Sequence, residues 1–390
     1  MLPSRYMGQG GLPACGVCAI IPDYPVAKLD VKIVLEPDDQ ATADALRAAG
    51  LPPYAEIVLA PRGAPRTKPR ALNVALPLAR GTLLTIFDAE DRPEPGQLRT
   101  AAAAFAAAGP RVACFQARLA IDNGNEGWLA YFFALGYAAL FDVINPGLAA
   151  LGLPLPLGGT SNHFRTDLLR RVAGWDAWNV TEDADLGLRF ARFGYSVGMI
   201  GSTTFEDAPT DLRGWLGQRS RWMKGWMQTF SVFLRTPRSQ FRKIGAIQGL
   251  SALSVMTSLL AGPLFGPFYG ARLVHDAIQG DLLAPQRFDA LALASLSLSI
   301  ALFGTAALVL PIALGMKRRG LKASPLLLLA PLYLLLMSAA AWRALWEWTR
   351  RPFVWTKTEH RPRPAQAAPV GLRNFPAKAS AIKARALSTP

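Results

Sequence analysis

The sequence predicts an α/β domain whose mainly parallel sheet is covered by helices on both faces, followed by a membrane-embedded helical region. Two observations lead to this prediction. Before about residue 242, short apolar strands alternate with helical segments, which is the pattern of parallel strands joined by crossover helices. After it come long apolar runs over about 247–272, 290–315 and 324–345, each meeting the ~20 residues needed to cross a bilayer.

The expected elements follow one another in a regular order. Apolar runs of strand length lie at 31–36, 55–60, 83–87 and 112–117. Helices are expected at 41–49, 71–79 and 128–141. A further amphipathic helix over 214–232 is rich in Trp and Arg, a composition that suits a helix lying at the bilayer interface.

Acidic residues directly follow two of these strands. Asp38 and Asp39 come after the first, and Asp88 and Glu90 come after the third. Ligands bind beyond the carboxyl ends of parallel strands, so these carboxylates should share one crevice. Carboxylate oxygens are hard ligands that suit Mg²⁺ or Mn²⁺. Asp88 and Glu90 are the expected metal ligands, with Asp91 as an alternative; a solvated acidic turn would show the same string.

A second acidic signature, Thr181-Glu182-Asp183, opens a predicted helix. A carboxylate here can act as a general base if it lies within hydrogen-bond reach of an attacking hydroxyl. Asp183 is the expected base and Glu182 the alternative. The competing interpretation is helix capping, because Thr181 is a good N-cap and acidic residues favour the first turn.

A third signature, Gln218-x-x-Arg221-Trp222, lies in the amphipathic helix. Its spacing places Gln218 and Arg221 about one turn apart, with Trp222 beside them. Arg can clamp a diphosphate, and Trp can stack on a sugar face or simply anchor the helix at the interface. Lys68, in the basic loop after the second strand, is a further candidate phosphate contact.

The net charge of +15 alone would fit a nucleic-acid-binding protein. Its distribution argues against that class, because basic residues crowd beside the apolar runs and in the C-terminal tail, as membrane-flanking charges do. The two clusters are Arg235, Arg238, Arg242 and Lys243, and Lys317, Arg318, Arg319 and Lys322. No nucleic-acid partner is therefore expected.

Taken in order, these signatures resemble those of the family 2 glycosyltransferases. The set comprises the Asp-Asp pair after a strand, Lys68-x-x-Ala71-Leu72-Asn73, Asp88-x-Glu90, Thr181-Glu182-Asp183 and Gln218-x-x-Arg221-Trp222. The chain looks most like the membrane-embedded, cellulose-synthase-like branch, over about residues 24–360 and including Trp355–His360. The resemblance implies a GT-A fold and inverting transfer of a sugar from a UDP-linked donor to a polysaccharide or lipid-linked acceptor.

The resemblance also implies roles for individual residues. On the donor side, the nucleotide would be contacted by Asp38 or Asp39, Lys68 and Asn73, and the donor-sugar pocket would be lined by the loop that carries Gly159, Thr160 and His163. The metal, Mg²⁺ or Mn²⁺, would be bound by Asp88 and Glu90. Asp183 would be the base, and the diphosphate and the acceptor end would be bound by Gln218, Arg221 and Trp222.

The chain departs from the family pattern in two places. The metal motif has Glu90 where many relatives have Asp. The first residues do not form the apolar strand and helix that normally build the floor of the nucleotide site, and Cys18–Pro22 would supply a stub of strand at best. Residues 1–23 are therefore expected to be irregular and the chain truncated at its N-terminus. The alternative function is a catalytically inactive remnant of such an enzyme.

The expected domains are a cytosolic GT-A domain over 24–242, a membrane region over 243–346 and a basic segment over 347–390, disordered from about 361. The basic loop 317–322 should be cytosolic, which places the catalytic domain at the inner face of the cytoplasmic membrane. The number of crossings stays open, because three would put the basic tail outside. Expected partners are the nucleotide-sugar donor, a glycan or lipid-linked acceptor, membrane lipids and an export subunit.

Overall fold

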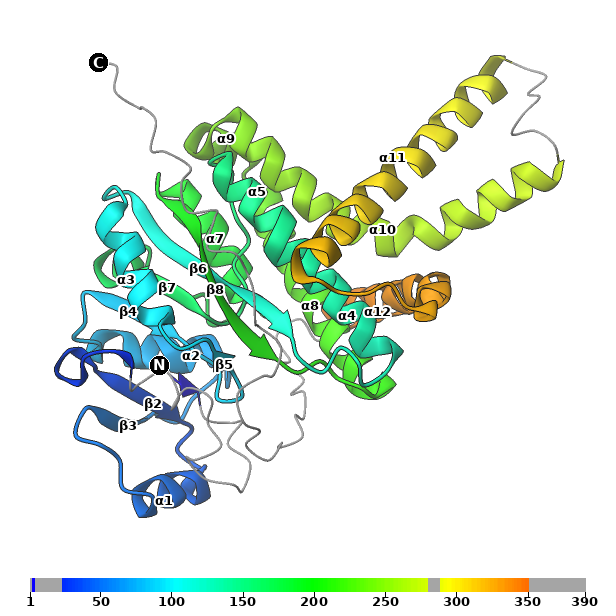
Figure 1. Ribbon diagram of the computed structural model, residues 1–390. Coiled ribbons are helices and arrows are strands. Elements are labelled where there is room, and N and C mark those ends of the chain that lie inside the picture. Colours follow the sequence, from blue (N-terminus) through cyan, green and yellow to red (C-terminus); the bar gives the residue numbers. More distant parts are fainter. Residues whose placement is uncertain (1, 4–22, 280–287, 351–390) are drawn as a thin grey trace.

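The computed structural model describes residues 2–3, 23–279 and 288–350 of the 390 (Figure 1). Its strands are β1 (Leu2–Pro3), β2 (Val31–Leu35), β3 (Ala55–Leu59), β4 (Leu83–Ile86), β5 (Arg92–Pro93), β6 (Val112–Ile121), β7 (Asn162–Arg165) and β8 (Ser196–Glu206). Its α-helices are α1 (Gln40–Ala48), α2 (Lys68–Ala75), α3 (Gln97–Ala107), α4 (Trp128–Ala139), α5 (Asn145–Ala150), α6 (Thr166–Arg171), α7 (Glu182–Arg192), α8 (Leu212–Arg235), α9 (Pro237–Ile244), α10 (Ala246–Gln279), α11 (Phe288–Arg319) and α12 (Ala330–Arg350). Short turns of 3-10 helix lie at Val26–Lys28, Leu76–Leu78 and Pro325–Leu329, and a π-helical turn at Leu140–Ile144 follows α4.

The strands form two sheets. The first is parallel, in the order β1-β2-β3, with Val31 opposite Ala55 and Leu35 opposite Leu59. The second has the order β4-β7-β6-β8-β5. In it β6 and β8 are parallel, whereas β4 with β7, β6 with β7 and β5 with β8 are antiparallel.

The α/β class predicted from the sequence is therefore confirmed, but the mainly parallel pairing was wrong for the second sheet, which is mixed. The difference arises at β7, where the sequence analysis expected only the loop that carries Gly159, Thr160 and His163. This strand enters between β4 and β6 and runs against both. Residue alternation shows which faces of a strand are buried but not its direction, so the sequence pattern could not reveal this pairing.

At the N-terminus, Leu2 and Pro3 pair in parallel with β2, although residues 1–23 were expected to be irregular. A two-residue bridge uses only backbone groups on an open strand edge, so it needs no apolar run in the sequence. The stub expected at Cys18–Pro22 lies outside the described residues. So do the ending at 355–360 and the tail expected to be disordered from 361.

Helices cover both faces of the five-stranded sheet, as predicted (Figure 1). On one face, α2, α6 and α7 close a core in which Phe164 packs against Trp175 and Phe190. On the other face, α3 packs over β6 and β8, with Ala101 against Ala117.

A further layer joins the sheet to the C-terminal helices. α4 packs on β6, and α8 contacts α4 through the fully buried Trp215 and through Phe133. Tyr333 of α12 completes this cluster, with its ring 5.3 Å from that of Trp215. The predicted amphipathic helix is therefore present as α8, and the side of it that carries Trp215 is an internal surface.

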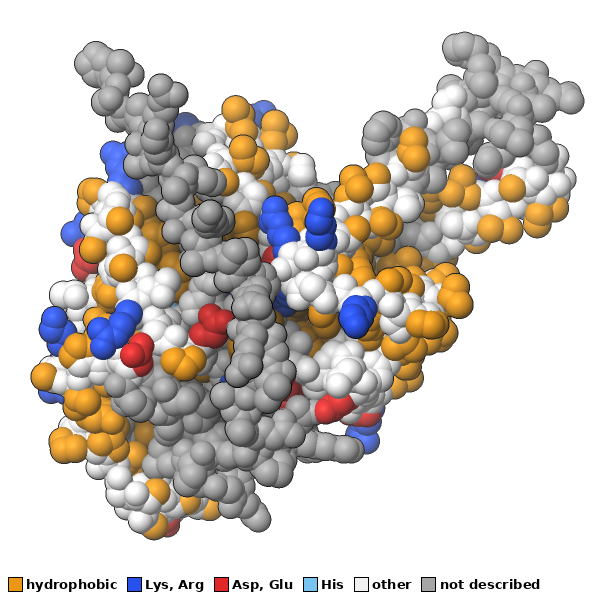
Figure 2. All heavy atoms as spheres, viewed as in Figure 1, with side chains coloured by type: hydrophobic (Ala, Val, Ile, Leu, Met, Phe, Trp, Pro, Cys, Tyr) orange, Lys and Arg blue, Asp and Glu red, His pale blue; other side chains and the backbone are white. Residues whose placement is uncertain are grey.

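Three helices are long and apolar enough to cross a membrane within the residues searched: Trp128–Ala150, Ala246–Gln279 and Pro325–Arg350. The last two coincide with predicted membrane runs, and α11 covers the other run. In Trp128–Ala150, 56% of the most apolar stretch is buried inside the protein. The corresponding shares are 22% in Ala246–Gln279 and 17% in Pro325–Arg350. α10 and α11 project away from the body (Figure 1), and Figure 2 shows hydrophobic side chains gathered over α10 and α12.

We expect Phe164→Ala to lower the free energy of unfolding by about 3–5 kcal/mol, because Phe164 is fully buried between two aromatic rings. Leu151→Ala is the control, since Leu151 is 74% exposed and its loss should cost no more than about 0.5 kcal/mol. Denaturant titration of both variants in detergent micelles measures the difference. Equal losses would contradict the described core.

Candidate active site

Lys68 lies at the centre of the candidate site. It is the first residue of α2, and its ammonium group pairs with the Asp88 carboxylate and donates to the Gly159 carbonyl oxygen at 2.8 Å. Burial lowers the pKa of Lys68, but the charges of Asp88 and Glu182 outweigh it and hold the pKa above its usual value. The side chain is therefore a permanent cation that joins α2, the turn after β4 and the loop before β7.

The acidic turn after β4 divides its carboxylates between two roles. Asp91 accepts from the Asp88 backbone N–H at 2.6 Å and from the Thr160 hydroxyl, and it is 1% exposed. It therefore closes the turn. Asp88 pairs with Lys68, while burial and the Asp88 charge raise the pKa of Glu90 to about 8. The turn thus presents Asp88 and Glu90, and holds Asp91 within the protein.

The first turn of α7 carries Glu182 and Asp183, as predicted. Thr181 is the N-cap residue of this helix, as the capping alternative expected. Its side chain, however, makes no capping hydrogen bond to the helix. Burial and the Asp183 charge raise the pKa of Glu182 to about 8. Burial also raises the pKa of Asp183 to about 6, although the Ala184 N–H and Lys68 favour its charged form.

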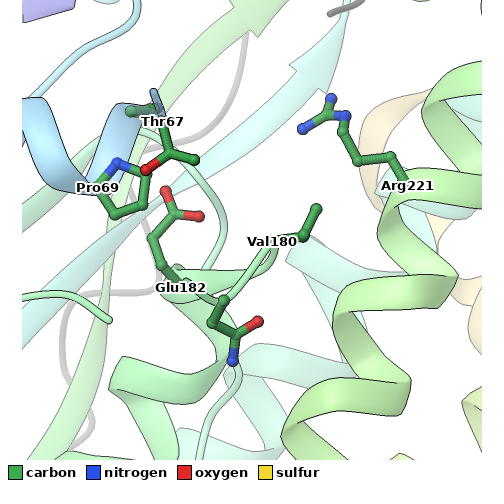
Figure 3. Close-up of a pocket in the computed structure, with 7 residues that line it drawn as sticks. Thr67, Pro69, Val180, Glu182 and Arg221 are labelled. Atoms are coloured by element: carbon green, nitrogen blue, oxygen red, sulfur yellow. The ribbon is translucent and has the colours of Figure 1, made fainter. Parts of the chain in front are cut away.

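Of these groups, Lys68 and Glu182 line one cleft, with Arg221 reaching in from α8 and Thr67 and Pro69 standing at the start of α2 (Figure 3). Glu182 lies beside Thr67 and Pro69, and Val180 stands between it and Arg221 (Figure 3). The full lining is Thr67, Lys68, Pro69, Asn179, Val180, Glu182 and Arg221. Gly159 lies against the same groups: a side-chain carbon added there would stand 3.4 Å from Asp183 Oδ2 and 3.9 Å from Lys68 Nζ.

The other residues of the α8 signature, Gln218 and Trp222, are not among those that line the cleft. The Trp222 ring meets Phe133 edge-on at 5.7 Å, inside the layer between α4 and α8. Between them the Arg219 guanidinium lies 4.0 Å from the Phe133 ring centre, and it donates to the Tyr333 hydroxyl at 3.2 Å. Gln218 is 8% exposed, and in the part of the chain described here its Oε1 atom has no hydrogen-bond partner.

Three residues expected at the nucleotide have partners within the protein. Asp39 caps α1 and accepts from the Thr42 hydroxyl at 2.7 Å. Asp38 forms a half-exposed ion pair with Arg66 at 2.7 Å. The Asn73 amide donates to the Trp175 carbonyl oxygen at 2.7 Å and accepts from the Trp175 N–H at 3.0 Å. Asn73 therefore fixes the loop that leads to Glu182.

His163 lies within the sheet, on β7, and is 1% exposed. Its Nδ1 atom is 2.7 Å from the Thr85 hydroxyl, and its Nε2 atom is buried without a partner among the described residues. Burial lowers the pKa of His163 to about 3, so the ring is neutral. The three residues of the predicted donor-sugar loop therefore have different surroundings. Gly159 lies beside Lys68 and Asp183, Thr160 donates to Asp91, and His163 is buried in the sheet.

One carboxylate of the site was missed by the sequence analysis. Glu206 ends β8 and accepts from the Tyr137 hydroxyl at 3.2 Å. Burial, together with the charges of Asp91 and Asp88, raises the pKa of Glu206 well above its usual value. A signal was available, because Glu206 is the last residue of β8 and Asp88 likewise stands just past the end of β4. Tyr137 sits in an apolar helix and gave no such signal.

The carboxylates of the site fit a divalent cation whose remaining ligands are supplied by the phosphates of the substrate. Within residues 23–279 and 288–350, no three acidic, His or Cys side chains are arranged to hold a metal alone. Mg²⁺ in phosphate-handling sites is usually bound by one or two carboxylates plus substrate phosphates. Asp88 and Glu90 supply that number, and burial together with the Asp88 charge raises the pKa of Glu90.

Comparison with solved structures defines the class of fold. The chain is similar to a mannosyltransferase from Pyrobaculum calidifontis in complex with GDP-Man and Mn²⁺, with a TM-score of 0.54 and 21% identity over 89% of this chain and 85% of that one. This likeness confirms the predicted GT-A glycosyltransferase fold.

The family model for glycosyl transferase family group 2 matches residues 83–346. The chain belongs to the family 2 glycosyltransferases, as the motifs predicted. It is 27% identical to the β-monoglucosyldiacylglycerol synthase of Synechocystis sp. over 226 residues, 55% of this chain and 44% of that protein. It is 30% identical to the cellulose synthase catalytic subunit (UDP-forming) of Komagataeibacter sucrofermentans over 167 residues, 40% of this chain and 18% of that protein. The chain thus spans less than half the length of these two relatives.

We expect Asn73→Ala to lower the free energy of unfolding by about 1–3 kcal/mol, because the buried Trp175 backbone loses a donor and an acceptor. Asn125→Ala, at an exposed asparagine, is the matched control. Denaturant titration measures both. If Asn73 acted only as a nucleotide contact, the variant would instead keep its stability and raise the donor KM.

Proposed function

We propose that this protein transfers a sugar, with inversion, from a nucleotide-sugar donor to a polysaccharide or lipid-linked acceptor. The observation that supports this best is the meeting of two groups at Gly159: Lys68, which is paired with Asp88, and Asp183 at the start of α7. A cationic, carboxylate-lined position for the donor diphosphate therefore lies directly beside a candidate base. Family membership supports sugar transfer as the reaction.

In the proposed reaction Asp183 accepts the proton of the acceptor hydroxyl. The acceptor oxygen then forms a bond to the anomeric carbon while the bond from that carbon to the diphosphate oxygen breaks. A single displacement inverts the configuration and needs no covalent intermediate. Lys68 and Arg221 would hold the diphosphate as its negative charge grows.

Asp88 and Glu90 would hold Mg²⁺ or Mn²⁺, which when bound would neutralise charge on the diphosphate. The presence of Mn²⁺ in the complex of the Pyrobaculum mannosyltransferase supports a divalent cation here. Within the turn, Asp91 would keep Asp88 in position through its hydrogen bond to the Asp88 N–H.

For the donor we propose a UDP-linked sugar. The cellulose synthase relative is a UDP-forming enzyme by name, whereas the structural neighbour holds GDP-Man, so both bases belong in the test. For the acceptor, the named relatives support either a diacylglycerol-based lipid or a glucan.

We propose that the enzyme works at the cytosolic face of the inner membrane, with α10, α11 and α12 embedded. Exposed apolar side chains on the first and last of these helices support embedding, among them Phe265, Phe268, Leu335 and Trp346. Lys317 near the end of α11 and Lys322 just after it, both exposed, would then lie at the cytosolic head groups, whereas Arg319 pairs with Asp142 within the protein. An export subunit would be a further partner for a polysaccharide product.

Membranes containing the protein should release nucleoside diphosphate from one member of a panel of UDP- and GDP-sugars in the presence of Mn²⁺ or Mg²⁺. Asp183→Asn should reduce kcat by about 10²–10⁴-fold, the usual contribution of a general base. Asp88→Ala and metal chelation should each abolish release. Asp167→Asn, at an exposed acid that pairs with Arg171 across one helical turn, is the control.

The outcome against this function would be a folded protein that releases nothing from any donor. That result would favour the inactive remnant.

The pH dependence tests which carboxylate is the base. Because burial raises the pKa of Asp183 to about 6, kcat/KM should rise with pH through about 6 rather than near 4, since only the charged form accepts a proton. Glu182→Gln should keep this limb. A limb near 8 that Glu182→Gln removes would assign the base to Glu182 instead, whose pKa burial raises to about 8.

A further inference from the structure

The segment Asn179–Thr181, which leads directly into the proposed base, is fastened to α8. The Val180 backbone N–H donates to Gln228 Oε1 at 3.0 Å. The Asn179 side-chain amide donates to the Thr229 hydroxyl oxygen at 2.9 Å. Asn179 and Thr229 are 4% and 2% exposed, so water does not compete with this second bond.

Gly225 lets α8 come close enough for these bonds to form. A side-chain carbon on Gly225 would stand 2.5 Å from the Thr181 side chain and 2.7 Å from the Thr181 backbone nitrogen. Gly225, Gln228 and Thr229 are spaced i, i+3 and i+4, so they share one helix face. That face meets three consecutive residues, Asn179, Val180 and Thr181, immediately before Glu182.

Neighbouring faces of the same helix are fixed by the membrane helices. Met223 and Met227 pack with Leu260 of α10 and with Ala341 of α12. Lys224, which is 2% exposed, lies 3.7 Å from Glu347 Oε2 of α12. These contacts resist rotation and sliding of α8, so the face that holds Asn179–Thr181 has a defined position.

We propose that Gln228 and Thr229 are positioning residues that place the Glu182-Asp183 turn at the cleft, with Gly225 permitting the contact. They act through the backbone before α7, and neither lines the cleft. This inference rests on the proposed function in taking Asp183 as the base. A displacement of about 1 Å at such a group can cost about 10²-fold in rate.

The test compares two matched pairs of variants. Thr229→Val removes the acceptor for Asn179 at nearly constant shape, whereas Thr229→Ser keeps it. Gln228→Leu removes the acceptor for Val180, whereas Gln228→Glu keeps an oxygen there. We expect the first of each pair to lower kcat by about 10–100-fold with donor KM within about twofold, and the second to restore most of it.

Hydrogen exchange of the peptide that spans 176–184 provides a readout that needs no activity. We expect Thr229→Val and Gln228→Leu to speed exchange at 180 and 181, and Thr229→Ser to leave it near the wild-type rate. Unchanged exchange, or faster exchange with unchanged kcat, would overturn the proposal. If the wild type releases no nucleoside diphosphate, the proposed function fails separately, and exchange still decides whether α8 holds the turn.

Discussion

The ammonium group of Lys68 meets the Asp88 carboxylate and the Gly159 carbonyl oxygen, and it lies within the electrostatic reach of Glu182. Burying carboxylates from several elements together is costly unless a cation is shared among them. The start of α2, the turn after β4 and the start of α7 must therefore converge on one point. Burial and the Asp88 charge keep the pKa of Glu90 raised even with Lys68 nearby.

The sequence was informative wherever function follows a local rule. Asp88, Glu90 and Asp183 stand at a strand end or a helix start, so pattern alone singled them out. The pattern could not predict which acidic side chain of a turn points into the protein. Asp91 accepts a hydrogen bond from Thr160, which is far away in the chain. Asp39 accepts a hydrogen bond from Thr42 and caps the helix that follows it. Such choices depend on long-range hydrogen bonds, which residue types do not encode singly.

The same limit explains the residues that the sequence did not single out. Gln228 and Thr229 belong to an amphipathic helix whose composition suggested only a lipid interface, yet both point into the protein toward Val180 and Asn179. The direction of β7 was likewise hidden, because alternation is the same for either orientation. Periodicity shows that a face is buried; it does not show what that face meets.

The packing of α8 determines whether the segment before residue 242 could exist without the helices that follow it. Hydropathy draws a boundary near residue 242, and a fragment ending there would look like a complete water-soluble catalytic unit. It would lack Glu347, the ion-pair partner of Lys224, and Tyr333, which closes the aromatic cluster around Trp215. Met223 and Met227 would become surface residues. The chain is therefore not modular at that boundary, and evolution could exchange α10 and α12 only together with the inner face of α8.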